Sequence, residues 1–237
     1  MLRFMFGESE RKAEGSLANA INLMENFISM LQSRVEAGKD TDHKLRTYEI
    51  WTKGLIASLN ELEQSCYAAH AFRGRIKANT VSDMSAEELL DYRRYVYFDK
   101  NAFIRVFSLM DKLSIFLNDF LEMKTEKIKP HFSYFTVLRN MREKNAHPNL
   151  TWKLNDVKEK FKESTGRLRK RRNVEIHYMN SEMQDDLAQS HKEYGEEVQL
   201  ENIASQSADL AQGLELVTES LRLTFQYACD KLRTKQG

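Results

Sequence analysis

The sequence predicts an all-α protein, a bundle of long helices, and three observations lead to this expectation. Apolar residues recur at steps of three and four along most of the chain, which is the spacing of one helix face. Only 2 Pro and 9 Gly occur among 237 residues, so long stretches contain no helix breaker. Hydrophobic residues make up 41% of the chain, enough to build a core. We expect at least about 65% helix and no β-sheet of consequence.

Two helices are expected near the start of the chain. The first covers residues 16–35, where the Ser16 hydroxyl can cap the N-terminus and Gly38 follows as a stop. The second covers about 41–72 and ends before Gly74, since glycine terminates helices readily.

The two longest helices are expected over about 85–122 and 197–232. Ser82 or Ser85 opens the first, and apolar residues cover more than half of its circumference. Such a helix has neighbours on several sides. The second carries a heptad stripe, which can pack inside the bundle or against a second copy of the chain. The sequence leaves both possibilities open.

The segment between these helices is expected to hold shorter ones. An aromatic helix over about 131–144 is followed by a loop over 145–149. Trp152 lies at the start of a further helix that becomes densely basic at residues 167–172. Polar and acidic residues over 180–197 predict an exposed connection.

The charge balance excludes a protein that coats nucleic acid without selectivity. Lys and Arg number 36 and Asp and Glu number 35, so the net charge is +1. Proteins that coat nucleic acid are much more basic, so any contact with RNA must be local.

Cysteine and histidine usage predicts neither a disulfide framework nor a metal site. Cys66 and Cys229 are far apart, and both fall in helical apolar patterns. The 6 His residues show no HExxH pairing, and we expect no metal and no cofactor. No apolar run approaches the ~18 residues that span a bilayer, so we expect a cytoplasmic protein without a membrane partner.

One short segment has the residues for phosphodiester chemistry, the run from Arg172 through Asn173 to His177. On a helix, Asn173 and His177 lie four residues apart and share a face. Arg172 is long enough to reach the same ligand, and its guanidinium can hold a phosphate through two parallel hydrogen bonds. A titratable imidazole beside that phosphate could activate a ribose 2′-OH without a metal.

This hexapeptide resembles the Arg-x4–6-His signature of the HEPN superfamily, in which the residue after Arg is typically Asn, Asp or His. The resemblance implies an up-and-down all-α core that dimerises with two motifs facing each other. Many HEPN domains are metal-independent endoribonucleases of toxin, abortive-infection or CRISPR systems, and others are inactive or nucleotide-binding. It further implies that Arg172, Asn173 and His177 are the catalytic residues of a core over about 85–235. Helices over about 16–75 would extend that core within one domain.

The basic run beside the motif supplies candidate contacts to the RNA backbone. These contacts are Arg167, Arg169, Lys170 and Arg171. A run of this kind can equally be a solvated helix face. Glu175 could pair with Arg171 or Arg172 on one face of the helix, or could orient His177.

A second Arg-x4-His segment runs from Arg142 to His147, with Glu143 after the arginine. Short motifs arise by chance, and Asn after Arg makes the Arg172 segment the less frequent coincidence. His147, in the loop before Pro148, is therefore the second choice for a catalytic histidine.

Two functions from different classes are consistent with the sequence. The first is an HEPN-like, metal-independent endoribonuclease or RNA-binding protein. It would act as a homodimer, leave a 2′,3′-cyclic phosphate and have an antitoxin-like protein as a possible partner. The alternative is a non-catalytic helical scaffold or regulator that binds a protein through its long C-terminal helix.

Overall fold

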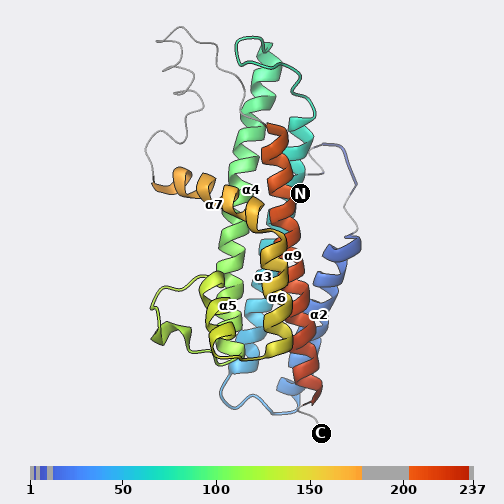
Figure 1. The fold of residues 1–237 in the computed structure, drawn as a ribbon. Coiled ribbons are helices and arrows are strands. Elements are labelled where there is room, and N and C mark those ends of the chain that lie inside the picture. The colour runs from blue at the N-terminus through green and yellow to red at the C-terminus, as the bar shows by residue number, and fades with distance from the viewer. Residues whose placement is uncertain (1–2, 4–5, 10–12, 178–202, 235–237) are drawn as a thin grey trace. The chain divides into compact units, whose positions relative to one another are not determined.

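The computed structural model describes residues 3, 6–9, 13–177 and 203–234, and about 80% of them are helical. Figure 1 shows the helices in chain order. They are α2 (Gly15–Glu36), α3 (Lys44–Arg73), α4 (Ala86–Phe120), α5 (Tyr134–Glu143), α6 (Pro148–Lys160), α7 (Lys162–His177) and α9 (Ile203–Thr234), with a 3-10 turn, η1 (Thr125–Lys127). The described residues form no strand. The all-α prediction is confirmed, and α4 and α9 are the two longest helices described.

The chain divides into two compact units, each assembled from three separate stretches. Unit 1 comprises residues 1–10, 62–105 and 162–214, and unit 2 comprises residues 11–61, 106–161 and 215–237. The predicted connection over 180–197 and the expected start of the last helix at 197–202 lie outside the described residues.

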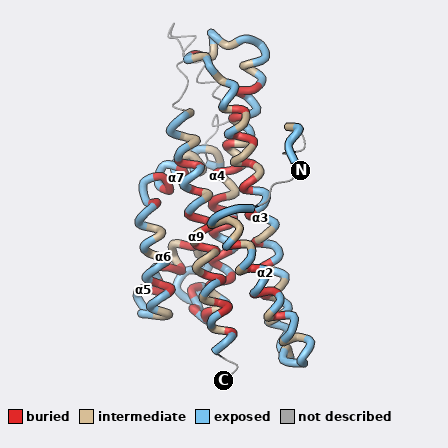
Figure 2. The backbone as a smooth tube through the Cα atoms, turned by 90° about the vertical axis from the view of Figure 1, so that its right-hand side faces the viewer, coloured by how far each residue is buried: buried red, intermediate tan, exposed pale blue. Residues whose placement is uncertain are grey.

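Aromatic rings from three helices form the centre of unit 2. Phe27 of α2, Phe116 of α4 and Phe225 of α9 contact one another with ring centroids 5.0–5.8 Å apart. All three side chains are almost completely buried. Figure 2 shows how buried and exposed positions alternate along these helices. Apolar residues at helical spacing thus pack against those of neighbouring helices. The apolar surface that they bury is the main stabilising contribution to a fold of this kind.

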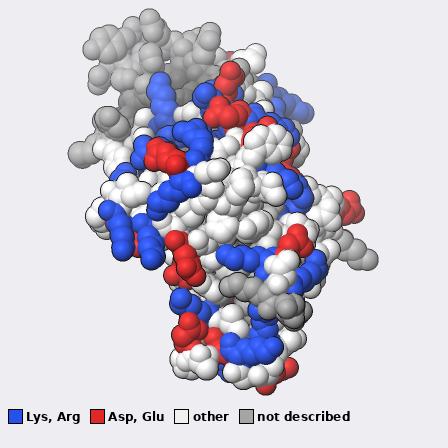
Figure 3. Space-filling view, turned by 60° about the horizontal axis from the view of Figure 1, so that its bottom comes forward, with Lys and Arg blue, Asp and Glu red and all other residues white. Residues whose placement is uncertain are grey.

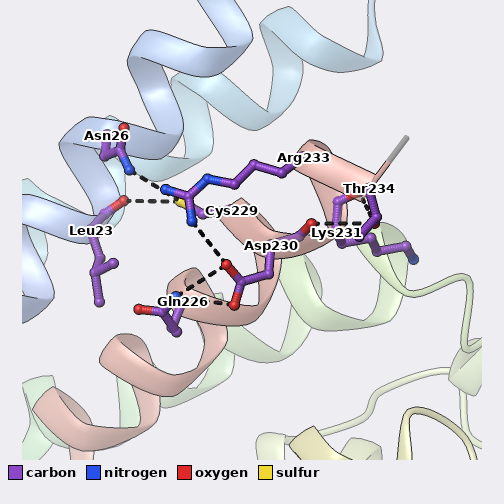
Figure 4. Close-up of polar contacts among 8 residues, drawn as sticks. All are labelled: Leu23, Asn26, Gln226, Cys229, Asp230, Lys231, Arg233 and Thr234. Atoms are coloured by element: carbon purple, nitrogen blue, oxygen red, sulfur yellow. Dashed lines mark hydrogen bonds and ion pairs between the residues drawn. The ribbon is translucent and has the colours of Figure 1, made fainter. Parts of the chain in front are cut away.

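The C-terminal turns of α9 are fixed to α2 by a buried thiol. Cys229 lies between Asn26 and the Leu23 carbonyl, with sulfur contacts of 3.9 and 3.7 Å (Figure 4). On the same helix, Asp230 accepts hydrogen bonds from Gln226 and Arg233. Burial raises the pKa of the Cys229 thiol to about 11, so the sulfur stays protonated and packs as an apolar group.

Helix starts differ from the predictions at two places. Glu14, and not Ser16, is the N-cap of α2, and the Ser16 hydroxyl instead donates to Glu219 of α9 at 2.8 Å. The start of α3 is capped by Asp40, whose carboxylate accepts from the Leu45 and Arg46 amides. Gly38 follows α2 with φ of +71°, as a glycine stop requires.

Two further helix boundaries concern the start of α4 and the end of α6. Ser85, and not Ser82, caps α4, because its hydroxyl accepts from the Glu88 amide at 3.2 Å. The single helix expected from Trp152 into the basic run is two helices. Phe161 leaves the helical region with φ −105° and ψ 19°, and its ring is buried there.

Among the described residues, no helix is both long enough and apolar enough to cross a membrane.

Candidate functional site

The predicted motif lies at the C-terminal end of α7, in unit 1. Arg172 is partly buried, whereas Asn173 and His177 are exposed. Between Asn173 and His177 in the sequence lie the apolar residues Val174 and Ile176, whose side chains are also exposed. His177 is the last residue of α7 that the structure describes. The structure thus confirms a helical motif with Asn173 and His177 one turn apart.

Two of the four predicted RNA contacts are bound to carboxylates of the same unit. Arg167 donates Nε and Nη2 to the two oxygens of Asp209 on α9, at 2.8 and 2.7 Å. This bidentate pair raises the pKa of the guanidinium, chiefly through its hydrogen bonds to Asp209. Arg171, one turn later, pairs with the buried Asp99 of α4 and lies over the Phe103 ring at 4.7 Å.

The basic run is therefore divided between two faces of α7. Arg167 and Arg171 are four residues apart and anchor the helix to α9 and α4. Arg169 and Lys170 are exposed. Arg167 is also exposed, at 53% of its side chain, so among the predicted RNA contacts only Arg171 is largely withdrawn from solvent.

Glu175 forms an ion pair outside its own helix. Its carboxylate contacts Lys100 of α4, with Nζ and Oε2 2.9 Å apart. Only 17% and 21% of the two side chains is exposed, so this ion pair is screened less than a surface pair. The pair gives α7 a third charged contact with the rest of unit 1, and the partner lies 75 residues away in sequence, beyond what helical spacing can predict.

The second Arg-x4-His segment forms a tight turn in unit 2, between α5 and α6. The Asn145 amide donates to the Arg142 carbonyl at 3.1 Å, and the Ala146 amide donates to the Met141 carbonyl at 2.9 Å. Asn145 and His147 both adopt left-handed backbone with φ of 46° and 48°. Left-handed backbone is uncommon outside glycine, although Asn and His tolerate it better than most residues. The turn places His147 as the N-cap residue of α6.

The His147 imidazole is held on both nitrogens. Its Nδ1 lies 2.7 Å from the hydroxyl of Tyr227 on α9, and its Nε2 lies 3.4 Å from the Leu121 carbonyl. The second contact is long for a hydrogen bond and correspondingly weak. Burial, and then the charge of Lys231, lower the pKa of this imidazole, while the Leu121 carbonyl opposes them. At neutral pH His147 is therefore neutral, the form that can accept a proton.

Three cationic residues belong to this turn or act on its histidine. Arg142 is exposed in the last turn of α5, and the Lys144 Nζ donates to the Met123 carbonyl at 2.8 Å. Lys231, one helical turn after Tyr227 on α9, is near enough to lower the pKa of His147. Positive charges that disfavour imidazolium also favour a bound phosphate.

Within the part of the chain that the structure describes, no three His, Cys, Asp or Glu residues are grouped as metal ligands. The face drawn in Figure 3 carries Lys and Arg interspersed with Asp and Glu, in agreement with the near-zero net charge. An RNA contact would thus depend on a few cations at one place.

Comparison with known proteins identifies the family. The model of the family described as HEPN_Cthe2314-like HEPN matches residues 51–229, well over half of the chain, and this range includes both Arg-x4-His segments. No curated protein and no solved structure gives a significant match. Together with the all-α fold, the family match shows that the chain belongs to the HEPN superfamily, as a member of the HEPN_Cthe2314-like family.

Proposed function

We propose that this protein is a metal-independent endoribonuclease that acts as a homodimer. Membership of the HEPN superfamily supports an RNase or nucleotide-related role, and the two Arg-x4-His segments supply the residue types that such cleavage needs. The function would require a base for the 2′-OH and an acid for the leaving oxygen. A symmetric pair of chains would provide two imidazoles for these two roles.

The observation that carries the proposal is the imidazole of His147, held on both ring nitrogens and within the influence of Lys231. Both Arg142 and His147 belong to one hydrogen-bonded turn, so their backbones are positioned before any substrate binds. Such positioning is a large part of what an active site contributes to a rate. His177 has a helical neighbour in Asn173 but is exposed at the end of α7. We therefore place the first candidate site at Arg142 and His147, and keep Arg172, Asn173 and His177 as the second.

The chemistry at His147 would begin with replacement of the weak Leu121 contact. A ribose 2′-OH near Nε2 would transfer its proton to the ring while the 2′-oxygen attacks the adjacent phosphorus. The bond from phosphorus to the 5′-oxygen then breaks, and that oxygen takes a proton from the second imidazole of the dimer. The products are a 2′,3′-cyclic phosphate and a 5′-hydroxyl. Arg142 would hold the phosphate oxygens through its guanidinium.

An RNA-cleavage assay with EDTA present tests the function and separates the two sites. We expect the wild-type chain to cleave RNA but not DNA, because DNA lacks the attacking 2′-OH. His147→Asn should lower the rate by about 10²–10⁴-fold, the usual contribution of general acid–base catalysis. Asn can adopt the left-handed backbone of this position, so the substitution removes the imidazole with little strain. Arg142→Lys should also lose activity, because an ammonium cannot form the two parallel hydrogen bonds.

The matched controls are His177→Asn and Arg172→Lys in the second motif, and His43→Asn at another histidine with left-handed backbone. Loss of activity in His177→Asn with full activity in His147→Asn would move the site to α7. Cleavage that requires added Mg²⁺ would refute the metal-independent mechanism. If pure wild-type protein cleaves no RNA, the proposed function is wrong, and the scaffold that binds a protein partner through α9 becomes the better hypothesis.

A further inference from the structure

The Tyr227 hydroxyl makes the closest polar contact of the His147 imidazole. The two residues are 80 apart in sequence and meet because the α5–α6 turn packs against α9 within unit 2. Their oxygen and Nδ1 are 2.7 Å apart, and the rings meet edge to face with centroids 5.6 Å apart. An imidazole held by a ring contact and a hydrogen bond has one orientation, so Tyr227 determines where Nε2 points.

The neighbours of His147 determine which ring nitrogen carries the proton at rest. A carbonyl oxygen only accepts, so the contact with Leu121 requires a proton on Nε2. Nδ1 then has a lone pair, and the Tyr227 hydroxyl must donate to it. When a substrate hydroxyl replaces Leu121 and needs Nε2 as an acceptor, the proton must be on Nδ1 instead. A phenol can accept as well as donate, so Tyr227 can hold the ring in both forms.

The charges around the pair keep both groups neutral. Burial raises the pKa of Tyr227, so its hydroxyl retains the proton that it donates. Burial and Lys231 lower the pKa of His147, and Lys231 lies one turn beyond Tyr227 on the same helix. The groups that act on the imidazole are thus the Leu121 carbonyl at the end of α4 and the Tyr227 and Lys231 side chains of α9.

Helix α9 is fixed in rotation at this level, so the Tyr227 contact does not depend on Tyr227 alone. Phe225, Ala228 and Cys229 are each fully buried, and the Cys229 thiol contacts the Leu23 carbonyl of α2. A rotation of α9 that moved Tyr227 away from His147 would expose these buried residues. The helix therefore presents the hydroxyl to the imidazole at a fixed position.

We infer that Tyr227 is a positioning residue for His147, fixing the orientation of the imidazole in the candidate ribonuclease site through the contact with Nδ1. The inference rests on the proposed function only for its catalytic consequence, since the hydrogen bond can be measured without any substrate. Tyr227 belongs to no short motif, and the sequence shows it only as one residue of the last helix.

Tyr227→Phe is the substitution that tests this role, because it removes the hydroxyl and keeps the ring contact. The first measurement is a proton–nitrogen correlation spectrum of the imidazoles at neutral pH, with the His147 signals assigned by their loss in His147→Asn. In the wild-type protein we expect His147 to carry its proton on Nε2, with the Nδ1 signal shifted by the hydrogen bond from Tyr227. In Tyr227→Phe the Leu121 carbonyl still keeps the proton on Nε2, and we expect the Nδ1 signal to move to the position of a nitrogen without a hydrogen bond. The control, Tyr97→Phe, removes the hydroxyl of an exposed tyrosine on α4 and should leave the His147 signals unchanged.

The second measurement is single-turnover RNA cleavage by the same proteins. Tyr227→Phe should lower the rate of the chemical step about tenfold, with substrate affinity unchanged, which corresponds to the loss of one hydrogen bond. An unchanged His147 Nδ1 signal in Tyr227→Phe would overturn the inference, and so would a changed Nδ1 signal with an unchanged cleavage rate. If the wild-type protein cleaves no RNA, the proposed function fails, and the Nδ1 result alone then supports or overturns the positioning of His147 by Tyr227.

Discussion

At the scale of single residues, the basic run of α7 separates into cations with different roles. Arg171 pairs with Asp99, whose side chain is only 3% exposed. Removing one partner of a buried pair leaves the other charge without compensation, at a cost of about 3–5 kcal/mol. Arg171 remains 23% exposed, and screening by solvent brings the expected cost below that range. We expect Arg171→Ala to lower the free energy of unfolding in urea by about 2–3 kcal/mol.

Lys170→Ala is the matched control for this prediction. Lys170 is exposed on the same helix, so its removal should change the stability by no more than about 0.5 kcal/mol. If Lys170 contacts RNA, its loss should make the slope of the logarithm of the RNA-binding constant against the logarithm of the salt concentration less steep by about one. Equal stability of the two variants would show that the Asp99 pair does not anchor α7.

The sequence contains the residue types of both candidate sites, and it does not show how those residues are held in place. Both Arg-x4-His segments are visible in the sequence, but their ranking depended on the residue after the arginine. The contacts that distinguish them join His147 to Tyr227 and Arg171 to Asp99, over 80 and 72 residues. Contacts between distant residues follow from helix packing, and periodicity along one chain does not specify them.

At the scale of helices, strong periodicity predicted α4 and α9, and boundaries set by local hydrogen bonds were harder to predict. The apolar pattern predicts neither the helix break at Phe161 nor the helix cap at Asp40. At the start of α3, Asp40 accepts from the Leu45 amide at 2.8 Å and from the Arg46 amide at 3.2 Å. These amides have no partner within the helix, so an acidic cap there satisfies them.

Asp40→Ala should therefore lower the free energy of unfolding by about 1 kcal/mol, the usual contribution of an N-cap side chain. The adjacent Lys39→Ala removes an exposed side chain from the same connection and serves as the control. Thermal unfolding followed by circular dichroism measures both. A loss in Lys39→Ala as large as that in Asp40→Ala would assign the effect to the loop and not to the cap.

At the scale of the whole molecule, the proposed chemistry requires two copies of the chain. We expect light scattering at micromolar concentration to find a homodimer, in the wild-type protein and equally in His147→Asn. The substitution removes an imidazole from the site and not an apolar contact, so it should leave the assembly intact. A wild-type protein that is monomeric under these conditions but cleaves RNA would contradict the two-imidazole mechanism.

The burial of the Cys229 sulfur allows local unfolding to be followed by alkylation of the thiol. Thiolates react with alkylating reagents and thiols hardly do, and burial raises the pKa of both Cys66 and Cys229. Cys66 belongs to unit 1 and Cys229 to unit 2. Cys229 is fully buried and becomes reactive only when its own surroundings open, whereas Cys66 is partly exposed. The Cys229 thiol is therefore a chemical reporter for the opening of unit 2, and its rate of alkylation would measure how often that unit opens.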